Sequence, residues 1–433
     1  MFDFIKKHFQ KDLITKKISK DKEPNLELDP LGGFLVNDNA LSETRNKLTF
    51  AKQNCNTLLI DSSFGARDYS LISQNIDVFS KAATKHNFIV LTDNDKIINQ
   101  TKDTLSQNGY NTLIFDFTSP DKSHKFNPLK EMYRDYSNNI KSKMPKNDAI
   151  IDVEPQLRDF VNSILNGTPT PLYQLQKDLF VSFLLAMIED DKYSLGTYNL
   201  ENFYNEFCKF NPKDKDVFER LDKHFENKCD YTKTLYSNFS SLNKVTKEAV
   251  LKDLAKNLEF LKDKAIHRFL AKNHFDIKSF VNTPSAIYIK HYNMEHYFNK
   301  FTNILLEYIV KQYIEEINTN ENLKLRPTNI FIENIFTARK LNILPYLMLI
   351  ARSRNMSCML RTENIGELKA MYPVECEAML DSCPYKVILT KDPKTMESLV
   401  YSLPAYKSAN DKQKAVIDSS KLLIAKSKIY TLD

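Results

Sequence analysis

Short, uninterrupted apolar segments alternate with helical segments along much of this chain, and this alternation constrains the fold more than any other feature. Each apolar segment is rich in Ile, Leu, Val, Phe or other apolar residues. Such runs are typical of strands buried on both faces, which occur in parallel sheets covered by helices. The predicted strands are Thr57–Ile60, Phe88–Leu91, Thr112–Phe115, Ala286–Ile289, Asn329–Ile332, Cys358–Leu360 and Lys386–Leu389.

The segments between these strands have the apolar spacing of helices. The predicted helices are Lys96–Asn108, Met294–Asn318, Lys340–Ser353 and Glu375–Ser382. Residues from about 130 to 280 interrupt the alternation, because they hold long helical patterns such as Gln174–Ile188 and Val245–Leu261 and no clear strand. We therefore predict an α/β domain with an all-α domain inserted into it.

A chain of 433 residues is long enough for this arrangement. The predicted parts are an amphipathic N-terminal segment at 1–30, the α/β domain at 31–130 and 281–405, the all-α domain at 131–280, and a C-terminal tail at 406–433. Within the first 25 residues, Phe2, Ile5, Phe9 and Leu13 recur at helical spacing among lysines. Such a helix either docks on its own protein or touches a membrane or a partner.

Composition excludes several classes of protein. The formal charge of +6 is compatible with nucleic acid or an anionic membrane surface but is too small to indicate either. The six cysteines form no C-x-x-C pair, and the histidines form no H-E-x-x-H, so we expect no metal site. No signal peptide and no run of about 18 apolar residues is present, so we expect no membrane-spanning helix.

The loop after the first predicted α/β strand occupies the place of a phosphate-binding turn. In the pattern G-x-x-x-x-G-K-[ST], backbone N–H groups cradle phosphates, the Lys reaches the β- and γ-phosphates, and the hydroxyl binds Mg²⁺. The four defining positions of this pattern hold Asp61, Ala66, Arg67 and Asp68 in this chain. None of them matches, so the loop taken alone predicts an ordinary strand–helix connection.

The order of the segments around this loop resembles the TraG/TraD group of type IV coupling proteins, the ring ATPases of conjugative DNA transfer. The family's strand ending in T-D-P-K-G is matched by FIVLTDNDKII, and its G-Y-x-V-x-x-x-D strand with S-x-x-[YF]-N-P by GYNTLIFDFTSPDKSHKFNPL. Its block R-S-R…I-x-Q-[SN]-x-x-Q-L-K-x-x-Y resembles ARSRNMSCMLRTENIGELKAMY, and RPTNIFIENI lies at the Walker B position. The resemblance covers roughly residues 30 to 405.

This resemblance implies a P-loop NTPase-like, RecA-like α/β fold, with a mostly parallel sheet, helices on both faces and the inserted all-α domain. It also implies a role in conjugative DNA transfer or type IV secretion, where family members form hexameric rings and pass DNA or relaxase-bound substrate to the secretion channel. Full-length relatives carry N-terminal transmembrane helices. We expect a cytoplasmic protein here, whose contact with the inner face of the cell membrane is peripheral and limited to residues 1–25.

The residues that hydrolyse ATP in the family are replaced in this chain. The family's Walker B strand ends in Asp-Glu, and the corresponding pair is Glu333-Asn334. Because Asn cannot accept a proton at neutral pH, the general base is lost. The Gln that senses the γ-phosphate is replaced by Glu363. Asp61, Asp68 and Glu363 therefore place carboxylates near the phosphates, and one such pair about 4 Å apart costs about 4 kcal/mol at an effective dielectric constant of about 20.

Arg67 keeps the positive charge of the missing Lys but not its shape or donor geometry. We expect Arg67 to pair with Asp61, Glu333 or Glu363, so that an internal ion network replaces nucleotide and Mg²⁺. The alternative is that these side chains face solvent. We therefore predict no catalytic residue and no cofactor, with ATP and Mg²⁺ bound only if the altered site retains binding.

Arg352 and Arg354 match family positions near the subunit interface of the ring. In an active relative, such arginines can stabilise phosphate charge on a neighbouring subunit. In this chain we expect them to form structural ion pairs.

The predicted function is that of a coupling-protein-like component of conjugation or type IV secretion, a pseudo-ATPase that acts as adaptor, regulator or ring subunit. One alternative is an active ATP-dependent DNA-translocating coupling protein with an atypical site. Another is a structural interaction subunit without DNA contact. The expected partners are type IV secretion or conjugation components, among them an active coupling protein or a relaxase, together with DNA and further subunits of a homo- or hetero-oligomer.

Overall fold

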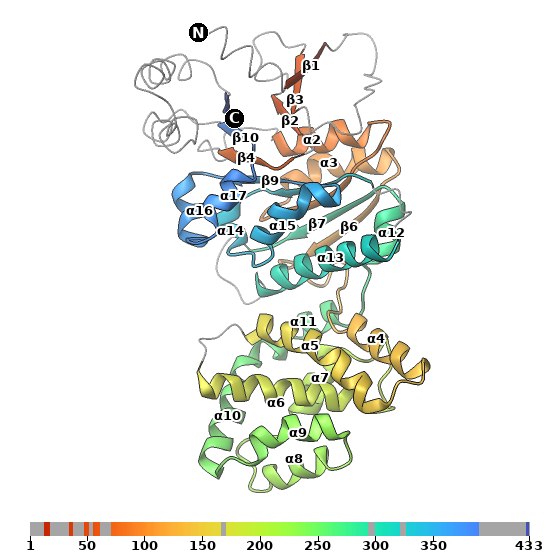
Figure 1. The fold of residues 1–433 in the computed structure, drawn as a ribbon, viewed down its shortest axis with the longest axis vertical. Helices are drawn as coiled ribbons and strands as arrows, with labels where there is room; N and C mark the ends of the chain where they lie inside the picture. Colours follow the sequence, from red (N-terminus) through yellow and green to blue (C-terminus); the bar gives the residue numbers. More distant parts are fainter. Residues whose placement is uncertain are drawn as a thin grey trace. The chain divides into compact units, whose positions relative to one another are not determined.

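The computed structural model describes residues 13–17, 34–37, 47–51, 55–60, 71–165, 170–292, 299–320, 326–388 and 430–432. The chain divides into two compact units (Figure 1). Unit 1 comprises residues 1–118, 277–299 and 309–433, and unit 2 comprises residues 119–276 and 300–308. The domain boundaries that we expected at residues 131 and 280 stay a prediction.

Unit 1 is built on an eight-stranded sheet with the order β11-β10-β4-β9-β8-β5-β7-β6. Its strands are β4 (Thr57–Ile60), β5 (Asn87–Thr92), β6 (Asn111–Asp116), β7 (Ser285–Lys290), β8 (Thr328–Ile332), β9 (Met356–Thr362), β10 (Tyr385–Ile388) and β11 (Tyr430–Leu432). Neighbouring strands are parallel, except that β11 runs antiparallel to β10. The predicted mostly parallel α/β fold is confirmed, and every predicted strand lies within two residues of an observed one.

Burial on both faces explains why these strands are continuous apolar runs. On one face, Val90, Tyr288 and Phe331 pack with residues of α2 (Leu71–Ser80) and α3 (Lys96–Gln107). Residues that point to the other face, such as Ile89 and Ile287, are buried as well. In the view of Figure 1, α13 (Asn299–Thr319) and α15 (Leu344–Ile350) cross the sheet.

One predicted helix of unit 1 is wrong in part. The segment Lys340–Ser353 begins four residues later than expected, because α15 starts at Leu344 with a proline in its first turn, where the fixed φ of proline suits a helix start. The preceding Arg339 has a φ of 64°, which ends the short helix before it. The remaining helices of unit 1 are α12 (Ile277–Asn282), α14 (Ile335–Ala338), the 3₁₀ helix η2 (Ala351–Arg354), α16 (Ile365–Met371) and α17 (Cys376–Asp381).

A second, antiparallel sheet near the N-terminus was not predicted. It contains β1 (Leu13–Lys17), β2 (Leu35–Asn37) and β3 (Lys47–Ala51) in the order β1-β3-β2. Leu13, the last apolar residue of the helical spacing, therefore begins a strand, and the earlier residues of that pattern lie outside the described residues. Phe34, which precedes β2, is buried with its ring 5.4 Å from that of Phe331.

Every element of unit 2 that the structure describes is a helix. These are α4 (Lys130–Lys141), α5 (Lys146–Leu165), α6 (Pro171–Ile188), α7 (Leu200–Phe207), α8 (Val217–Phe225), α9 (Asp230–Ser240), α10 (Lys244–Asn257), the 3₁₀ helix η1 (Glu259–Lys262), α11 (Lys264–Leu270) and the part of α13 at Lys300–Tyr308. The last eleven residues of helix α6 are all buried, so burial extends around the whole circumference of the helix. This is expected for a helix at the centre of a domain. Asp178 of α6 accepts a hydrogen bond of 2.7 Å from Arg158 of α5.

None of the helices in the described residues is long and apolar enough to cross a membrane.

Buried asparagines fasten the amino ends of the strands in unit 1. Asn56 donates to the carbonyl of Met348 at 2.6 Å and accepts from the backbone N–H of Cys358 at 2.9 Å. Asn87 makes comparable contacts at the start of β5, whereas Asn329 of β8 contacts the ring of His86 and the hydroxyl of Ser357. A buried backbone group without a partner is costly, so these amides fix the strand starts relative to the elements that precede them.

We expect Asn56→Ala to lower the free energy of unfolding by about 3 kcal/mol, because it leaves one buried N–H and one buried carbonyl without partners. Urea denaturation of the variant and the parent measures this difference. The matched control is Asn282→Ala at the exposed end of α12, where we expect a change below about 0.5 kcal/mol. Equal effects of the two substitutions would contradict the role given to Asn56.

Candidate functional site at the carboxyl edge of the sheet

A row of polar side chains lies at the carboxyl ends of five neighbouring strands. The apolar core on the face covered by α2 and α3 includes Val90, Tyr288, Phe331 and Met359. On each of these four strands, a polar residue lies two positions after the core residue. Alternate residues of a strand point to the same face, so the polar residue faces the same side as the core. The row therefore continues the core toward the sheet edge, and it consists of Asp116 (β6), Lys290 (β7), Thr92 (β5), Glu333 (after β8) and Arg361 (β9).

The strand register puts the members of this charged row at one level. Asp116 and Thr92 both pair with Lys290 in the sheet. Ile332 of β8 pairs with Leu360 of β9, and Glu333 and Arg361 are the residues that follow them. From β6 to β9 the charged residues thus alternate in sign, acid, base, acid and base, which reduces the cost of burying them side by side.

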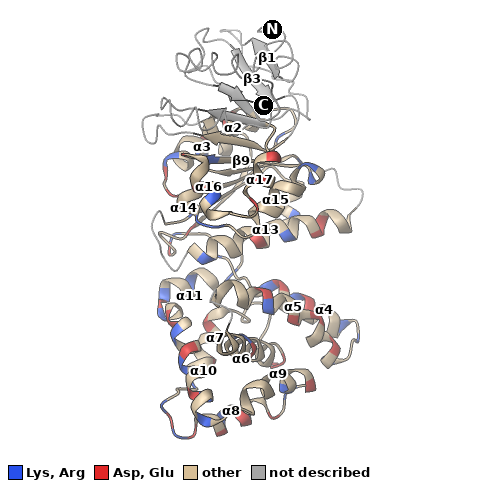
Figure 2. Cartoon of the chain, turned by 60° about the vertical axis from the view of Figure 1, so that its left-hand side comes forward, with Lys and Arg blue, Asp and Glu red and all other residues tan. Residues whose placement is uncertain are grey.

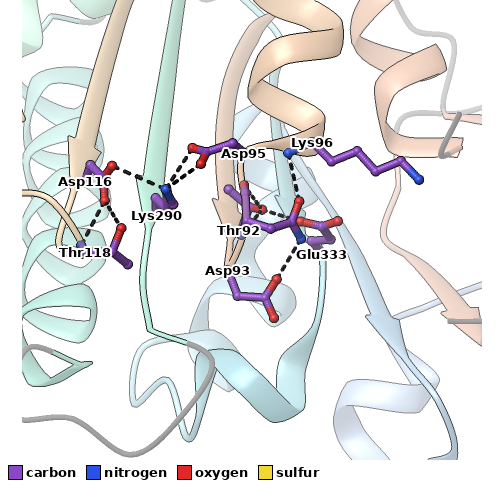
Figure 3. Close-up of polar contacts among 9 residues, drawn as sticks. Thr92, Asp93, Asp95, Lys96, Asp116, Thr118, Lys290 and Glu333 are labelled. Carbon is purple, nitrogen blue, oxygen red and sulfur yellow. Dashed lines mark hydrogen bonds and ion pairs between the residues drawn. The ribbon is translucent and has the colours of Figure 1, made fainter. Parts of the chain in front are cut away.

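Lys290 joins two acids on neighbouring elements (Figure 3). Its Nζ lies 2.8 Å from both carboxylate oxygens of Asp95 and 3.4 Å from Oδ2 of Asp116. The other oxygen of Asp116 accepts from the backbone N–H and the hydroxyl of Thr118 at 2.8 and 2.6 Å. Burial by itself lowers the pKa of Lys290, but Asp95 and Asp116 outweigh it and hold this pKa above its ordinary value.

The start of α3 is arranged around this contact. Asp95 is the N-cap residue of α3, yet its carboxylate makes no capping hydrogen bond and extends to Lys290 instead. The side-chain oxygen of Asn94 accepts from the backbone N–H of Lys96 at 2.9 Å. Lys290 therefore links the connection between β5 and α3 to β7, and through its contact with Asp116 it also links this connection to β6.

Glu333 is the buried acid of the row, with only 6% of the residue exposed. It accepts a hydrogen bond from the hydroxyl of Thr92, which comes from the neighbouring strand β5 (Figure 3). Burial raises the pKa of Glu333 above its ordinary value, and the negative charge of Asp93 adds to this. The hydrogen bond from Thr92 and the charge of Arg361 act in the opposite direction.

Asn334 is engaged in starting a helix. Its side-chain oxygen accepts from the backbone N–H of Phe336 at 3.0 Å, which makes Asn334 the N-cap of α14. The residue is 5% exposed. The oxygen is therefore held by the protein backbone at the position where the family places its general base.

The other candidate residues from the sequence do not join this row. Asp61, Ala66, Arg67 and Asp68 lie outside the described residues, so the expected pairing of Arg67 stays a prediction. Glu363 follows β9 and is half-buried. Arg352 is exposed, and Arg354 donates to the side-chain oxygen of Asn318 at 2.8 Å.

Our sequence reasoning missed Lys290, Asp95 and Arg361 as site residues. A signal for two of them was present, because Lys290 and Arg361 are charged residues at the ends of otherwise apolar strands. A charge at the end of a buried strand needs a partner nearby. The strand order that supplies these partners does not follow from the sequence pattern.

The polar side chains at this edge contact other groups of the protein. Both oxygen-bearing side chains at the end of β8 contact protein groups, and Lys290 is neutralised by two acids. Among the described residues, no group of three or more His, Cys, Asp or Glu side chains is placed to hold a metal ion. The loop that would face the phosphates lies outside them.

A family model described as type IV secretory system conjugative DNA transfer matches residues 82–398. The chain belongs to this family. The match spans the ends of β5, β7, β8 and β9, so the charged row lies within the part of the chain that is shared with the family. A comparison with curated protein sequences finds no match.

Solved structures extend this finding to the fold. The plasmid coupling protein TrwB in complex with the non-hydrolysable GTP analogue GDPNP is similar with a TM-score of 0.52 and 13% identity, over 90% of this chain and 82% of that chain. VirB4 of Thermoanaerobacter pseudethanolicus is similar with a TM-score of 0.51 and 11% identity, over 92% and 91%. At these identities the likeness shows a shared P-loop NTPase-like α/β fold.

We expect Glu333→Gln to remove a pH-dependent loss of stability. Because the pKa of Glu333 is raised above 4.5 in the folded protein, its contribution is largest below the unfolded pKa and is lost as the pH rises through the folded pKa. The free energy of unfolding of the variant relative to the parent should therefore increase between about pH 4 and pH 7. Urea denaturation across this range measures the trend, and a decreasing difference would contradict the raised pKa.

We expect Lys290→Met to lower the free energy of unfolding by about 2 kcal/mol, because it leaves Asp116 half-buried without its cation, while the more exposed Asp95 remains hydrated. Adding Asp116→Asn should recover part of this loss. Lys102→Met on the exposed side of α3 is the control, with an expected change below about 0.5 kcal/mol. Chemical denaturation measures all of these variants, and failure of Asp116→Asn to recover stability would contradict the pairing.

Proposed function

We propose that this chain is a coupling-protein-like component of conjugative DNA transfer or type IV secretion that does not hydrolyse nucleotide. It acts as an adaptor, a regulator or a ring subunit. Membership of the conjugative DNA transfer family supports the first part of this proposal. The contacts at the end of β8 support the second part.

The end of β8 carries the proposal of a lost hydrolytic activity. Hydrolysis of a nucleotide needs a carboxylate that takes a proton from the attacking water or orients it. In this chain that position holds Asn334, whose side-chain oxygen accepts the backbone N–H of Phe336. An amide has no useful basicity at neutral pH, and its oxygen is already committed to the start of α14.

The charge at this edge gives the proposal further support. Of the described cations in the row, Lys290 is paired with Asp95 and Asp116, and Arg361 acts on the buried Glu333. Lys290 is therefore already engaged by two acids of the protein, which leaves less positive charge at this edge to offset the charge of a triphosphate.

An active partner subunit is the natural complement of such a chain. TrwB, named as a plasmid coupling protein, has been solved with a nucleotide analogue bound. A nucleotide-hydrolysing coupling protein of this kind can supply the energy for transport while this chain recruits a substrate or regulates the assembly. We place it in the cytoplasm, in contact with conjugation or type IV secretion components at the inner face of the membrane.

DNA contact through unit 2 belongs to the proposal and is tested separately. Figure 2 shows basic and acidic positions interspersed along the helices of unit 2. Helix α10, for example, carries Lys244, Lys247, Lys252 and Lys256 together with Glu248 and Asp253. This mixed charge offers no uniformly basic surface, so any contact with a nucleic-acid backbone should be weak and salt-sensitive.

We expect no heat of binding with ATP and Mg²⁺ up to millimolar concentration and no phosphate release in the presence of single-stranded DNA. Isothermal titration calorimetry and a phosphate-release assay measure the two properties, and an active coupling protein in the same buffer is the positive control. Binding with micromolar affinity would sink the proposal. A DNA titration over a salt series separates an adaptor that contacts DNA from a structural subunit that does not, because phosphate contacts weaken steeply with salt.

A further inference from the structure

Lys300 is a half-buried lysine whose amine has no acidic partner among the described residues. It is the second residue of α13 and lies in the part of this helix that belongs to unit 2. Its Nζ donates to the carbonyl oxygen of Ile164 at 3.1 Å and lies 4.2 Å from the centre of the Phe260 ring. Lysines that lose contact with water are ordinarily paired with an acid, so this arrangement is unusual.

The carbonyl of Ile164 explains why the amine is held at this place. Ile164 lies in the last turn of α5, where carbonyl groups lack a partner within the helix and carry partial negative charge. The residue is 1% exposed, so a donor from the protein is needed there. The amine of Lys300 therefore acts as a C-terminal cap for α5.

The remaining surroundings of the amine favour a positive charge less than a carboxylate would. The face of the Phe260 ring attracts a cation but supplies no full charge. Lys300 also lies in the first turn of α13, where the helix dipole disfavours a cation. Burial removes water from the ammonium group and lowers the pKa of Lys300 to about 8.

The charged groups on the elements around the amine do not compensate it. Glu259 and Lys262 of η1 form an ion pair with each other at 2.7 Å. Residues 162–165, the last turn of α5, contain no charged side chain. On α13 the next charged residue is Glu307, which lies two turns further along the helix. Burial therefore sets the protonation state of Lys300.

We propose that Lys300 is a site of covalent modification by small activated acyl groups, and that acylation of this residue loosens the last turn of α5. A lysine that is desolvated without an acid partner presents a neutral, nucleophilic amine near neutral pH. The half-buried position leaves the amine within reach of small reagents. This proposal goes beyond the proposed function and does not depend on it.

The chemical step is the transfer of an acyl group from an acyl phosphate or a thioester. The neutral Nζ attacks the acyl carbon, and a bond forms between the nitrogen and that carbon. The bond from this carbon to the phosphate oxygen or to the thiol sulfur breaks, and the leaving group keeps the electron pair. The amine releases one proton to solvent, so the step needs no oxidant or reductant.

Acylation changes what the side chain offers to its neighbours. It removes the positive charge and leaves an amide, whose N–H can still donate but whose attraction to the helix end and to the ring is lost. The added acyl group also needs space beside Phe260 and Ile164. The last turn of α5 should therefore open more often once Lys300 is acylated.

Labelling of the parent protein by acetyl phosphate, followed by peptide mass spectrometry, tests the reactivity of Lys300. A lysine that is half deprotonated at pH 8 has on the order of 100-fold more neutral amine at pH 7.5 than an ordinary lysine. Partial burial offsets some of this gain, so we expect Lys300 to react about tenfold faster than Lys177. Lys177 is the matched control, because it is also half-buried and lies 5.0 Å from the centre of a tyrosine ring.

The pH profile separates a reactive amine from one that is merely accessible. The rate at Lys300 should level off above about pH 8. A parallel reaction with acetyl-coenzyme A distinguishes the two kinds of donor, and preferential labelling of Lys300 by either one supports the proposal. Labelling slower than at Lys177 with both donors, or a rate at Lys300 that keeps rising to pH 10, would overturn it.

Hydrogen–deuterium exchange tests the effect on α5. Lys300→Gln, which lacks the charge as the acylated residue does, should raise amide exchange in the last turn of α5 about threefold. Lys300→Arg, which keeps the charge, and Lys177→Gln should leave this turn unchanged. Equal exchange in Lys300→Gln and the parent would overturn the effect on α5. The labelling of the parent keeps the proposal falsifiable if Lys300→Gln does not fold.

Discussion

Compensation of buried charge at the carboxyl edge is the constraint around which unit 1 is organised. The strands are apolar along their length, but the row that closes them contains Asp116, Lys290, Glu333 and Arg361. Charges in such a place are tolerated only when each has a partner of opposite sign or a hydrogen bond. The strand order supplies these partners, because it brings β6, β7, β5, β8 and β9 together although they are far apart in sequence.

The two edges of the sheet solve the problem of buried polar groups in different ways. At the amino edge, neutral amides such as Asn56 and Asn87 satisfy backbone N–H and carbonyl groups of neighbouring elements. At the carboxyl edge, ionised side chains compensate one another across strands. The concentration of charged groups at the carboxyl edge fits the general tendency of α/β proteins to place function at the carboxyl ends of their strands.

Much of the fold could be predicted because its strands are buried on both faces. A run such as Ala286–Ile289 has few alternatives once it is flanked by helical segments, and it lies inside the observed β7. The sheet of β1, β2 and β3 was not predicted, because its strands are only three to five residues long and β1 and β2 show no alternation of apolar and polar residues. Helix breaks such as the one at Arg339 depend on local backbone geometry that a periodic pattern does not contain.

The candidate site could be predicted only in part. Glu333 and Asn334 were found because the family pattern marks their place, and the structure adds that one is held by Thr92 and the other by the backbone of α14. Lys290 was not found, because the acids that it contacts, Asp95 and Asp116, lie more than 170 residues away in the sequence. Pairing across crossovers of this length is set by topology and not by any local pattern.

Strand β11 has a consequence for the association of this protein with other molecules. It occupies Tyr430–Leu432 and pairs antiparallel with β10 at the margin of the main sheet. Fraying of β11 would expose the backbone groups of β10, and an open strand of that kind invites association between molecules. Three paired residues in β11 therefore separate the parallel part of the sheet from an exposed edge.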